Sequence, residues 1–337
     1  MSEPAVALNP PRLVVELAER VAARGGRAYA VGGVVRDHLL GRPLYDWDIE
    51  VHRLPESELE RILEGLGTVD AVGRAFSVFK LTRRGLTIDV ALPRQDSNSG
   101  PGHRGIAVRG DPNLGPREAC RRRDLTVNAI LCDVLTSELV DPFGGAEDLR
   151  ARRLRAVDAN TFLEDPLRAL RVVQFAARLH FTVDDSLLAL CRQAPVDELP
   201  EERVREEWFK LLRAQHIAHG LDVARRSDLL ARVFPEAADA QTDAALDRQS
   251  PTEEPEEPRK MALMLLTWLA DRDRSAALAT LDRLGLHRWL GYPVRDQLDK
   301  AHSALQEPAD TDAALRHLAA RAEPFLVLQT RAALDPQ

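Results

Sequence analysis

The stretch VGGVVRDHLLGRPLYDWD, residues 31–48, carries the pattern that decides the fold. A short apolar segment ends at the pair Gly32 and Gly33, and the residues after it have the apolar spacing of a helix. A glycine pair between a strand and a helix lets backbone N–H groups approach an anion such as a triphosphate. The same pair could equally be a simple tight turn. Arg36 could reach a phosphate with Asp37 orienting it, or the two could form a structural ion pair.

Two aspartates close this stretch. Residues i and i+2 of a strand face the same side, so Asp46 and Asp48 are predicted to place two carboxylates at one spot. Such carboxylates repel one another unless a cation lies between them, and hard oxygen ligands suit Mg²⁺. Asp89, in the alternating segment LTIDVAL, is the candidate third ligand. Two Mg²⁺ ions held there could activate a 3′-hydroxyl and stabilise a leaving pyrophosphate. Taken alone, an Asp-x-Asp pattern could also be a solvated strand end.

The segments around this stretch predict a small α/β domain that ends near residue 95. Helices are expected at 12–24, 34–41 and 57–67, and strands at 28–33, 46–52 and twice within 77–94. Residues 96–116 are rich in Gly, Pro, Ser and Asn, and they predict a mobile loop. The first domain, with this loop, is therefore expected to cover residues 1–117 and is called the head below.

The pattern becomes mostly helical from about Glu118, with one short hairpin at 129–145. The expected class is α+β, with a mixed sheet and helices in the head followed by an all-helical remainder. That remainder is predicted to comprise a neck (118–215), a body (216–249) and an RNA-binding tail (259–337). An acidic, proline-rich linker at 250–258 has no apolar anchor and is expected to be solvated.

Bulk properties exclude several classes of protein. The three cysteines, Cys120, Cys132 and Cys191, lack any Cys-x-x-Cys spacing, which argues against a disulfide framework or a zinc site and fits a reducing cytoplasm. The N-terminus lacks the pattern of a signal peptide, and no apolar run approaches the ~20 residues of a membrane helix. The net charge of −7 means that any contact with nucleic acid must come from a local basic strip.

Residues 31–48 are similar to the first motif of the class II tRNA nucleotidyltransferases, the CCA-adding enzymes and their poly(A) polymerase relatives. The matching positions are Gly32, Gly33, Arg36, Asp37, Asp46 and Asp48. The resemblance covers about Tyr29 to Leu212 and implies a catalytic head like that of DNA polymerase beta. Four more segments follow in the family's order: RRRDLTVNAI (121–130), DPFGGAEDLRARRLR (141–155), EDPLRALRVVQFAARL (164–179) and LPEERVREEWFKLL (199–212).

The second segment implies a site for the ribose and the triphosphate. In the family this motif favours ribonucleotides, and the resemblance carries that role to Arg123, Asp124 and Asn128. Asp and Asn can hydrogen-bond ribose hydroxyls, and Arg can pair with a phosphate through two bonds. Asp124 could instead cap a helix together with Thr126.

The fourth segment implies how a base is chosen. On a helix, Asp165 and Arg168 are expected to share one face, where acceptors and donors together can match the edge of a base. In the family this motif acts as a protein template that selects CTP and ATP, with Glu164 positioning Arg168. Arg171, one turn further on, extends the same face. An ordinary salt bridge between Glu164 and Arg168 is the alternative.

The third and fifth segments are interpreted as mainly structural. Asp141, Gly145, Asp148 and Leu149 match the family's turn between head and neck, and the arginines from Arg150 to Arg155 are either phosphate contacts or a solvated face. Glu202, Arg203, Val204 and Glu207 match a neck helix held by ion pairs.

The resemblance implies Mg²⁺-dependent addition of CCA to the acceptor end of a tRNA from CTP and ATP, in the cytoplasm. A CC-adding enzyme, an A-adding enzyme and a poly(A) polymerase carry the same motifs and stay open. A catalytically silent RNA-binding module is the alternative from another class. No His-Asp dipeptide occurs, so the phosphohydrolase domain of some relatives is not expected, and neither a membrane nor an obligate protein partner is indicated.

Overall fold

The computed structural model describes residues 8–70, 78–98, 106–249, 257–305 and 323–334. It divides into two compact units, of which the first ends at Asp165 and the second begins at Pro166. All three cysteines are buried and free, which agrees with the prediction that the chain has no disulfide framework. None of the helices in the described ranges has the length and apolar character needed to cross a bilayer.

A mixed seven-stranded sheet forms the centre of the first unit, in the order β3-β4-β5-β2-β1-β8-β9. β2 and β5 run parallel, and every other neighbouring pair is antiparallel. The sheet and the helices that follow confirm the predicted α+β class. The strands are β1 (Arg27–Val31), β2 (Asp48–His52), β3 (Thr68–Asp70), β4 (Val78–Arg83), β5 (Leu86–Ala91), β8 (Leu131–Asp133) and β9 (Leu139–Val140).

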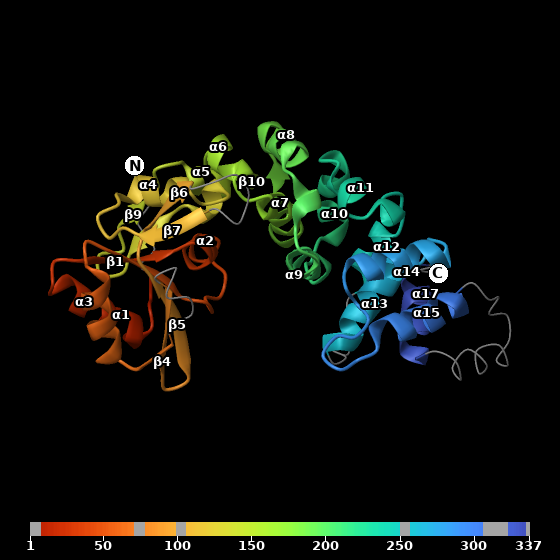
Figure 1. Ribbon diagram of the computed structural model, residues 1–337, viewed down its shortest axis with the longest axis horizontal. Coiled ribbons are helices and arrows are strands. Elements are labelled where there is room, and N and C mark those ends of the chain that lie inside the picture. The colour runs from red at the N-terminus through yellow and green to blue at the C-terminus, as the bar shows by residue number, and fades with distance from the viewer. Residues whose placement is uncertain (1–7, 71–77, 99–105, 250–256, 306–322, 335–337) are drawn as a thin grey trace. The chain divides into compact units, whose positions relative to one another are not determined.

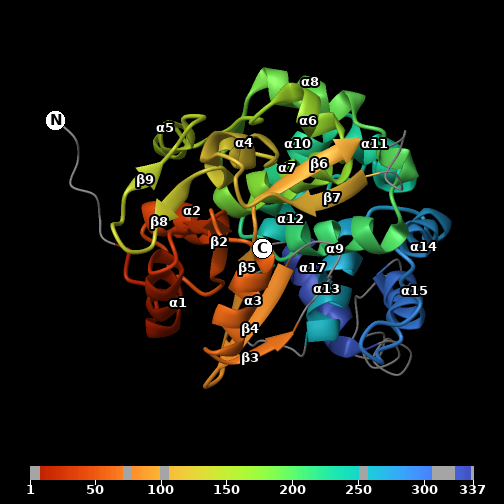
Figure 2. The same ribbon diagram turned by 60° about the vertical axis from the view of Figure 1, so that its left-hand side comes forward.

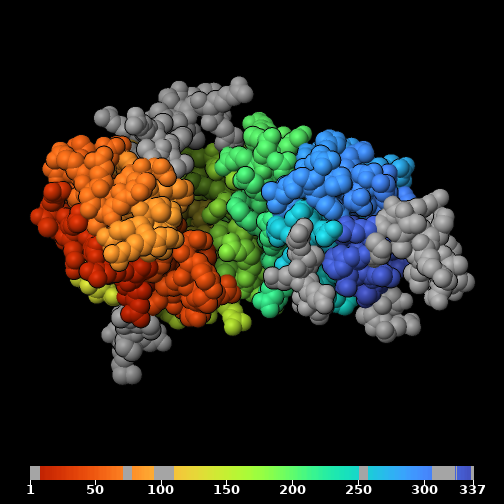
Figure 3. All heavy atoms as spheres, turned by 90° about the horizontal axis from the view of Figure 1, so that it is seen from below, coloured from red at the N-terminus to blue at the C-terminus, as the bar shows by residue number. Residues whose placement is uncertain are grey.

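Helices cover this sheet. The first, α1, buries Leu13, Leu17 and Val21 at helical spacing, and it packs on β1 and α3 (Figures 1 and 2). Figure 3 shows another face of the unit, formed largely by its N-terminal strands and helices in red to orange. The helices of this unit are α1 (Arg12–Ala22), α2 (Gly33–Leu39), α3 (Glu56–Glu64), α4 (Pro116–Arg121), α5 (Gly145–Arg150) and α6 (Ala159–Leu163), with a short 3-10 turn η2 (Thr126–Asn128).

Part of the segment predicted as a loop is a second strand pair. β6 (Arg94–Asn98) and β7 (Ile106–Gly110) are antiparallel, with Arg94 opposite Gly110, so the loop prediction was wrong at 96–98 and 106–110. Residues 99–105 of the predicted loop lie outside the described residues. Composition indicated turn-forming residues but could not reveal that their flanks satisfy each other's backbone groups. Just outside the strand pair, where Pro93 precedes β6 and Asp111 follows β7, the Asp111 amide donates to the Pro93 carbonyl at 2.8 Å.

The predicted hairpin at 129–145 is present as β8 and β9. β8 also pairs with β1, with Ala30 opposite Cys132, so the hairpin is part of the central sheet of the first unit. The finer division of the chain into head, neck, body and tail stays a prediction.

The second unit is built mainly of helices. Its core includes three aromatic rings, with Trp208 centred 4.6 Å from Phe234 and 5.1 Å from Trp268. The helices are α7 (Leu167–Leu179), α8 (Asp185–Gln193), α9 (Glu201–Leu212), α10 (Ile217–Arg226), α11 (Leu229–Val233), α12 (Asp243–Arg248), α13 (Glu257–Leu269), α14 (Arg274–Arg283), α15 (Val294–Leu305) and α17 (Pro324–Leu334).

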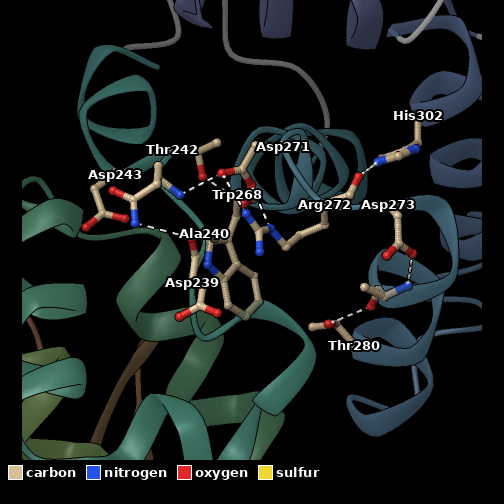
Figure 4. A network of polar contacts seen from close by, with 12 residues as sticks. Asp239, Ala240, Thr242, Asp243, Trp268, Asp271, Arg272, Asp273, Thr280 and His302 are labelled. Carbon is tan, nitrogen blue, oxygen red and sulfur yellow. Dashed lines mark hydrogen bonds and ion pairs between the residues drawn. The ribbon is translucent and has the colours of Figure 1, made fainter.

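A polar network joins the two sides of the predicted linker within this unit (Figure 4). The Thr242 hydroxyl, just before α12, donates to the carbonyl of Trp268 in α13 at 2.7 Å. Further along, a ring nitrogen of His302 lies 2.8 Å from the Arg272 carbonyl. Of the linker itself, residues 250–256 lie outside the described residues, and Glu257 and Pro258 already belong to α13.

Candidate active site

A row of polar side chains lies along one face of β2. Asp48, Glu50 and His52 alternate with Ile49 and Val51, which are buried in the core. The buried residues hold the strand in place, so the polar row has a fixed position on the other face.

Asp48 and Asp89 are brought together by strand pairing, because they lie opposite each other where β2 and β5 run parallel. Burial, reinforced by the carboxylates of Asp89 and Asp46, raises the pKa of Asp48 to about 6. The negative charges of Asp46 and Asp89 therefore both act on Asp48 and make its ionisation less favourable.

Asp89 also has a partner that the sequence analysis did not single out. The Lys80 ammonium on β4 lies 2.8 Å from Asp89 Oδ1, and this hydrogen bond raises the pKa of Lys80. The turn at Arg84 and Gly85 fixes the register of β4 and β5 so that Lys80 faces Asp89. That short turn was the signal in the sequence that could have identified Lys80.

The turn at Gly32 can only be made by a residue without a side chain. Gly32 has a φ of +68° and comes directly before α2, which begins at Gly33. A Cβ at position 32 would lie 3.3 Å from Nη1 of Arg123 and 3.9 Å from Oδ2 of Asp48. The glycine thus lets a predicted metal ligand and a predicted phosphate ligand approach the same backbone.

Arg36, predicted to contact a nucleotide, is buried in a polar network. Its guanidinium makes two bonds of 2.9 Å to Asp37 and donates to Asn128 Oδ1 at 2.7 Å. Asn128 in turn donates to Asp124 Oδ1 at 3.1 Å, and the Leu125 amide donates to the same oxygen. The structural ion pair between Arg36 and Asp37 is present, and a phosphate contact by Arg36 stays a prediction.

A cleft of about 300 Å³ opens beside these groups in the first unit. It is lined by both carboxylates and guanidinium groups, the combination needed to hold a metal-bound polyphosphate. The charged residues on its walls are Asp48, Glu50, Asp89, Arg94, Arg122 and Arg123.

The carboxylate oxygens of Asp46, Asp48 and Asp89 are the kind of donor that a hard divalent cation prefers. Burial is the main cause of the raised pKa of Asp48, and the charges of Asp89 and Asp46 add to it. Within the described ranges, no three His, Cys, Asp or Glu side chains are already arranged as a metal cage. Asp89 is paired with the ammonium group of Lys80.

The motif predicted to select the base lies at the start of α7, and part of its predicted geometry was wrong. Arg168 and Arg171 lie within the helix, whereas Asp165 precedes Pro166, the N-cap residue. Because proline has no backbone N–H, it is suited to a helix start, and Asp165 is left outside the first turn. Glu164 also precedes α7, so Asp165 and Arg168 do not lie together on one helix as predicted.

The turn motif at 141–155 has the structural role that was predicted. Asp148 is fully buried and accepts bonds from Thr126, Arg153 and Arg155. Gly145 lies so close to the Thr126 carbonyl that an added Cβ would be 2.1 Å from its oxygen. This cluster fixes η2, and with it Asn128.

The fold and the site together define a nucleotidyltransferase head followed by a helical unit. Residues 28–155 match the Poly A polymerase head domain, and residues 180–241 match the "Probable RNA and SrmB- binding site of polymerase A". The chain belongs to the class II nucleotidyltransferase family, which contains the CCA-adding enzymes and the poly(A) polymerases.

Curated relatives support this placement. The chain is 40% identical over 217 residues to the Multifunctional CCA protein of Stenotrophomonas maltophilia (strain K279a), covering 62% of this chain and 52% of the relative. Against that of Aromatoleum aromaticum the identity is 41% over 216 residues, with coverage of 62% and 51%. The chain thus spans about half the length of the curated relatives it matches.

A solved structure extends the likeness to nearly the whole chain. The Bacillus stearothermophilus CCA-adding enzyme in complex with CTP superposes with a TM-score of 0.72 at 25% identity, covering 97% of this chain and 80% of that one. A further CCA-adding enzyme, in its apo form II, has a TM-score of 0.75 at 22% identity and supports the fold alone.

Proposed function

We propose that this chain adds CCA to the 3′ end of tRNA from CTP and ATP without a nucleic-acid template. The observation that carries the proposal is the pairing of Asp48 with Asp89 in a cleft that is also lined by Arg123. The turn at Gly32 lies close to both Arg123 and Asp48. The relatives named for CCA addition and the related structure with CTP support the choice of substrates.

Asp46 and Asp48 are proposed to hold Mg²⁺, with Asp89 as a further acidic group whose ion pair with Lys80 must adjust. When bound, the metal would supply positive charge to the triphosphate and to the attacking 3′-hydroxyl. The chain's own groups have separate tasks: Arg123 and the amides after Gly32 orient the phosphates, and Asp124 and Asn128 bind the ribose.

Choice of base is assigned to the start of α7. We propose that Arg168 donates to the edge of the incoming base and Asp165 accepts from it, with Glu164 and Arg171 supporting them. Asp165, placed before the helix, would reach the base from the connecting segment, and Arg168 from the first turn of α7.

The direct test is incubation with tRNA lacking its 3′ CCA, Mg²⁺ and each nucleotide separately and in pairs, followed by sequencing of the products. CCA addition predicts two C residues with CTP alone and a completed end only with CTP and ATP. Addition of C alone or of A alone would identify a partial enzyme, and long A tails would identify a poly(A) polymerase. Absence of any product would favour a binding module.

A further inference from the structure

Glu50 is a buried carboxylate that the proposed chemistry does not use. Only 9% of the residue is exposed, and both carboxylate oxygens have partners. Oε2 accepts from Arg123 Nη2 at 3.2 Å, and Oε1 lies 2.8 Å from Nε2 of His52. A charge buried this deeply is costly unless it is paired on each side, as it is here.

His52 connects this carboxylate to the segment that follows β7. Its other ring nitrogen, Nδ1, lies 3.0 Å from the Leu114 carbonyl, and next to it the Arg53 amide donates to the Pro112 carbonyl at 2.6 Å. The ring also packs edge-on against Tyr29, with centroids 5.2 Å apart. His52 is therefore held on three sides and gives Glu50 a fixed position.

Arg123 has a second carboxylate nearby. Its Nη1 and the Oδ2 of Asp48 both lie within 4 Å of the point where a Cβ on Gly32 would be. The charge of Arg123 lowers the cost of ionising Asp48, so the two groups interact electrically. Without Glu50, the guanidinium would be drawn toward Asp48, the proposed metal ligand.

We propose that Glu50 and His52 are positioning residues for nucleotide binding. Glu50 holds Arg123 at the wall of the cleft, in place to receive the triphosphate and away from Asp48, and His52 fixes Glu50. The inference rests on the proposed function, because it takes Arg123 as a phosphate ligand. It adds two residues that act through Arg123.

The test compares Glu50→Gln with Asp133→Asn. Asp133 is also a buried carboxylate of the central sheet, bonded to Arg27 at 2.9 Å, but it does not line the cleft. Loss of a charge-assisted bond predicts that Glu50→Gln raises KM for CTP and ATP about tenfold, while kcat changes less than about threefold. The dissociation constant of a non-hydrolysable CTP analogue should rise in parallel. Asp133→Asn should lower Tm without changing either value.

His52 provides a second, independent pair of variants. His52→Phe keeps a ring against Tyr29 but removes both polar contacts, so KM should rise severalfold. His52→Gln retains an amide that can donate to Glu50, and it should recover most of the wild-type KM. If Glu50→Gln does not fold, these variants and Glu50→Asp still decide the question.

The inference is overturned if the Glu50 and His52 variants keep the wild-type KM and analogue affinity, or if Asp133→Asn changes them equally. Failure of the proposed function looks different. In that case the unaltered protein would neither bind the analogue nor extend the RNA, whatever the variants do.

Discussion

Asp48 of β2 lies directly opposite Asp89 of β5, in the parallel strand pair of an otherwise antiparallel sheet. The two carboxylates are neighbours because the register of the parallel strands pairs Asp48 with Asp89. The repulsion is partly offset by Lys80, which binds Asp89, and by Arg123 near Asp48. The site is therefore built to accept further positive charge.

Asp46→Ala and Asp48→Ala should each abolish nucleotide addition, because each removes an oxygen donor to the proposed metal. We expect a loss of roughly a thousandfold or more with the fold intact, measured by primer extension and circular dichroism. Glu60→Ala, on the exposed side of α3, is the control and should be fully active. Substantial turnover in both aspartate variants would place the metal elsewhere.

The raised pKa of Asp48 predicts a pH-dependent gain in stability for Asp48→Asn without metal. The folded protein keeps the Asp48 proton up to about pH 6, whereas the unfolded chain releases it at the ordinary value of 3.8. The protonated Asp48 side chain therefore stabilises the fold fully below about pH 4, and this contribution is lost as the pH rises through 6.

Asparagine is never charged, so Asp48→Asn should raise Tm at pH 7.5 in EDTA by about 2–4 °C and leave it unchanged at pH 4. Thermal unfolding followed by fluorescence measures both values. Glu60→Gln, exposed and distant from the acidic pair, should change neither. An equal Tm for Asp48→Asn and the unaltered protein at pH 7.5 would mean that the Asp48 carboxylate is not destabilised by its surroundings.

Much of the central sheet could be predicted from the sequence, because polar and apolar residues alternate strictly in the segment DWDIEVH. The same alternation that selected Asp46 and Asp48 also places Glu50 and His52 on the face of β2 that carries Asp48, although the strand begins at Asp48 and leaves Asp46 just before it. Their roles could not be predicted, since the contacts to Arg123 and Leu114 join residues far apart in the chain. Spacing within one strand carries no information about such partners.

The start of α7 shows a second limit of sequence patterns. Helical spacing correctly identified Leu167–Leu179, but it extended the helix over Asp165, which Pro166 leaves outside. Asp165 lies only two residues before the start of α7, yet it is a residue proposed to select the base. Helix ends depend on local capping rather than on periodicity, and patterns determine them least well.

Arg168→Ala should relax the choice of base more than it weakens binding of the triphosphate, because its guanidinium is proposed to contact the base edge. Asp165→Ala should do the same to a smaller degree. We expect misincorporation of UTP and GTP to rise about tenfold for Arg168→Ala, as one charge-assisted bond is lost. Competition assays with all four nucleotides measure this ratio.

Arg178→Ala is the matched control for base choice, because Arg178 lies in the last turn of the same helix and contacts the Phe175 ring. Its preference for CTP and ATP should match that of the unaltered protein. A wild-type preference in Arg168→Ala would show that these residues do not act as a protein template.

Binding of RNA should depend on few phosphate contacts, because the chain has a net charge of −7. Arg153 and Arg155 are bonded to buried Asp148 and are assigned to structure. Arg150 and Arg152 are exposed, so they are the proposed phosphate contacts of this segment. Replacing both with alanine should make the log–log salt dependence of tRNA binding shallower by about 1.4–1.8, since each contact contributes roughly 0.7–0.9.

Filter binding at several salt concentrations measures that slope, and Arg24→Ala, exposed just after α1, should leave it unchanged.

The same assay distinguishes folded tRNA from an unstructured RNA as the preferred substrate. A few contacts at fixed positions can be satisfied together only by an RNA of matching shape, so folded tRNA should compete better than an unstructured oligo(A) of equal length. A flexible strand pays the entropy of ordering before it gains the same contacts. Equal competition by oligo(A) would therefore mean that Arg150 and Arg152 bind a single strand as well as a folded RNA. That result would favour the poly(A) polymerase alternative over CCA addition.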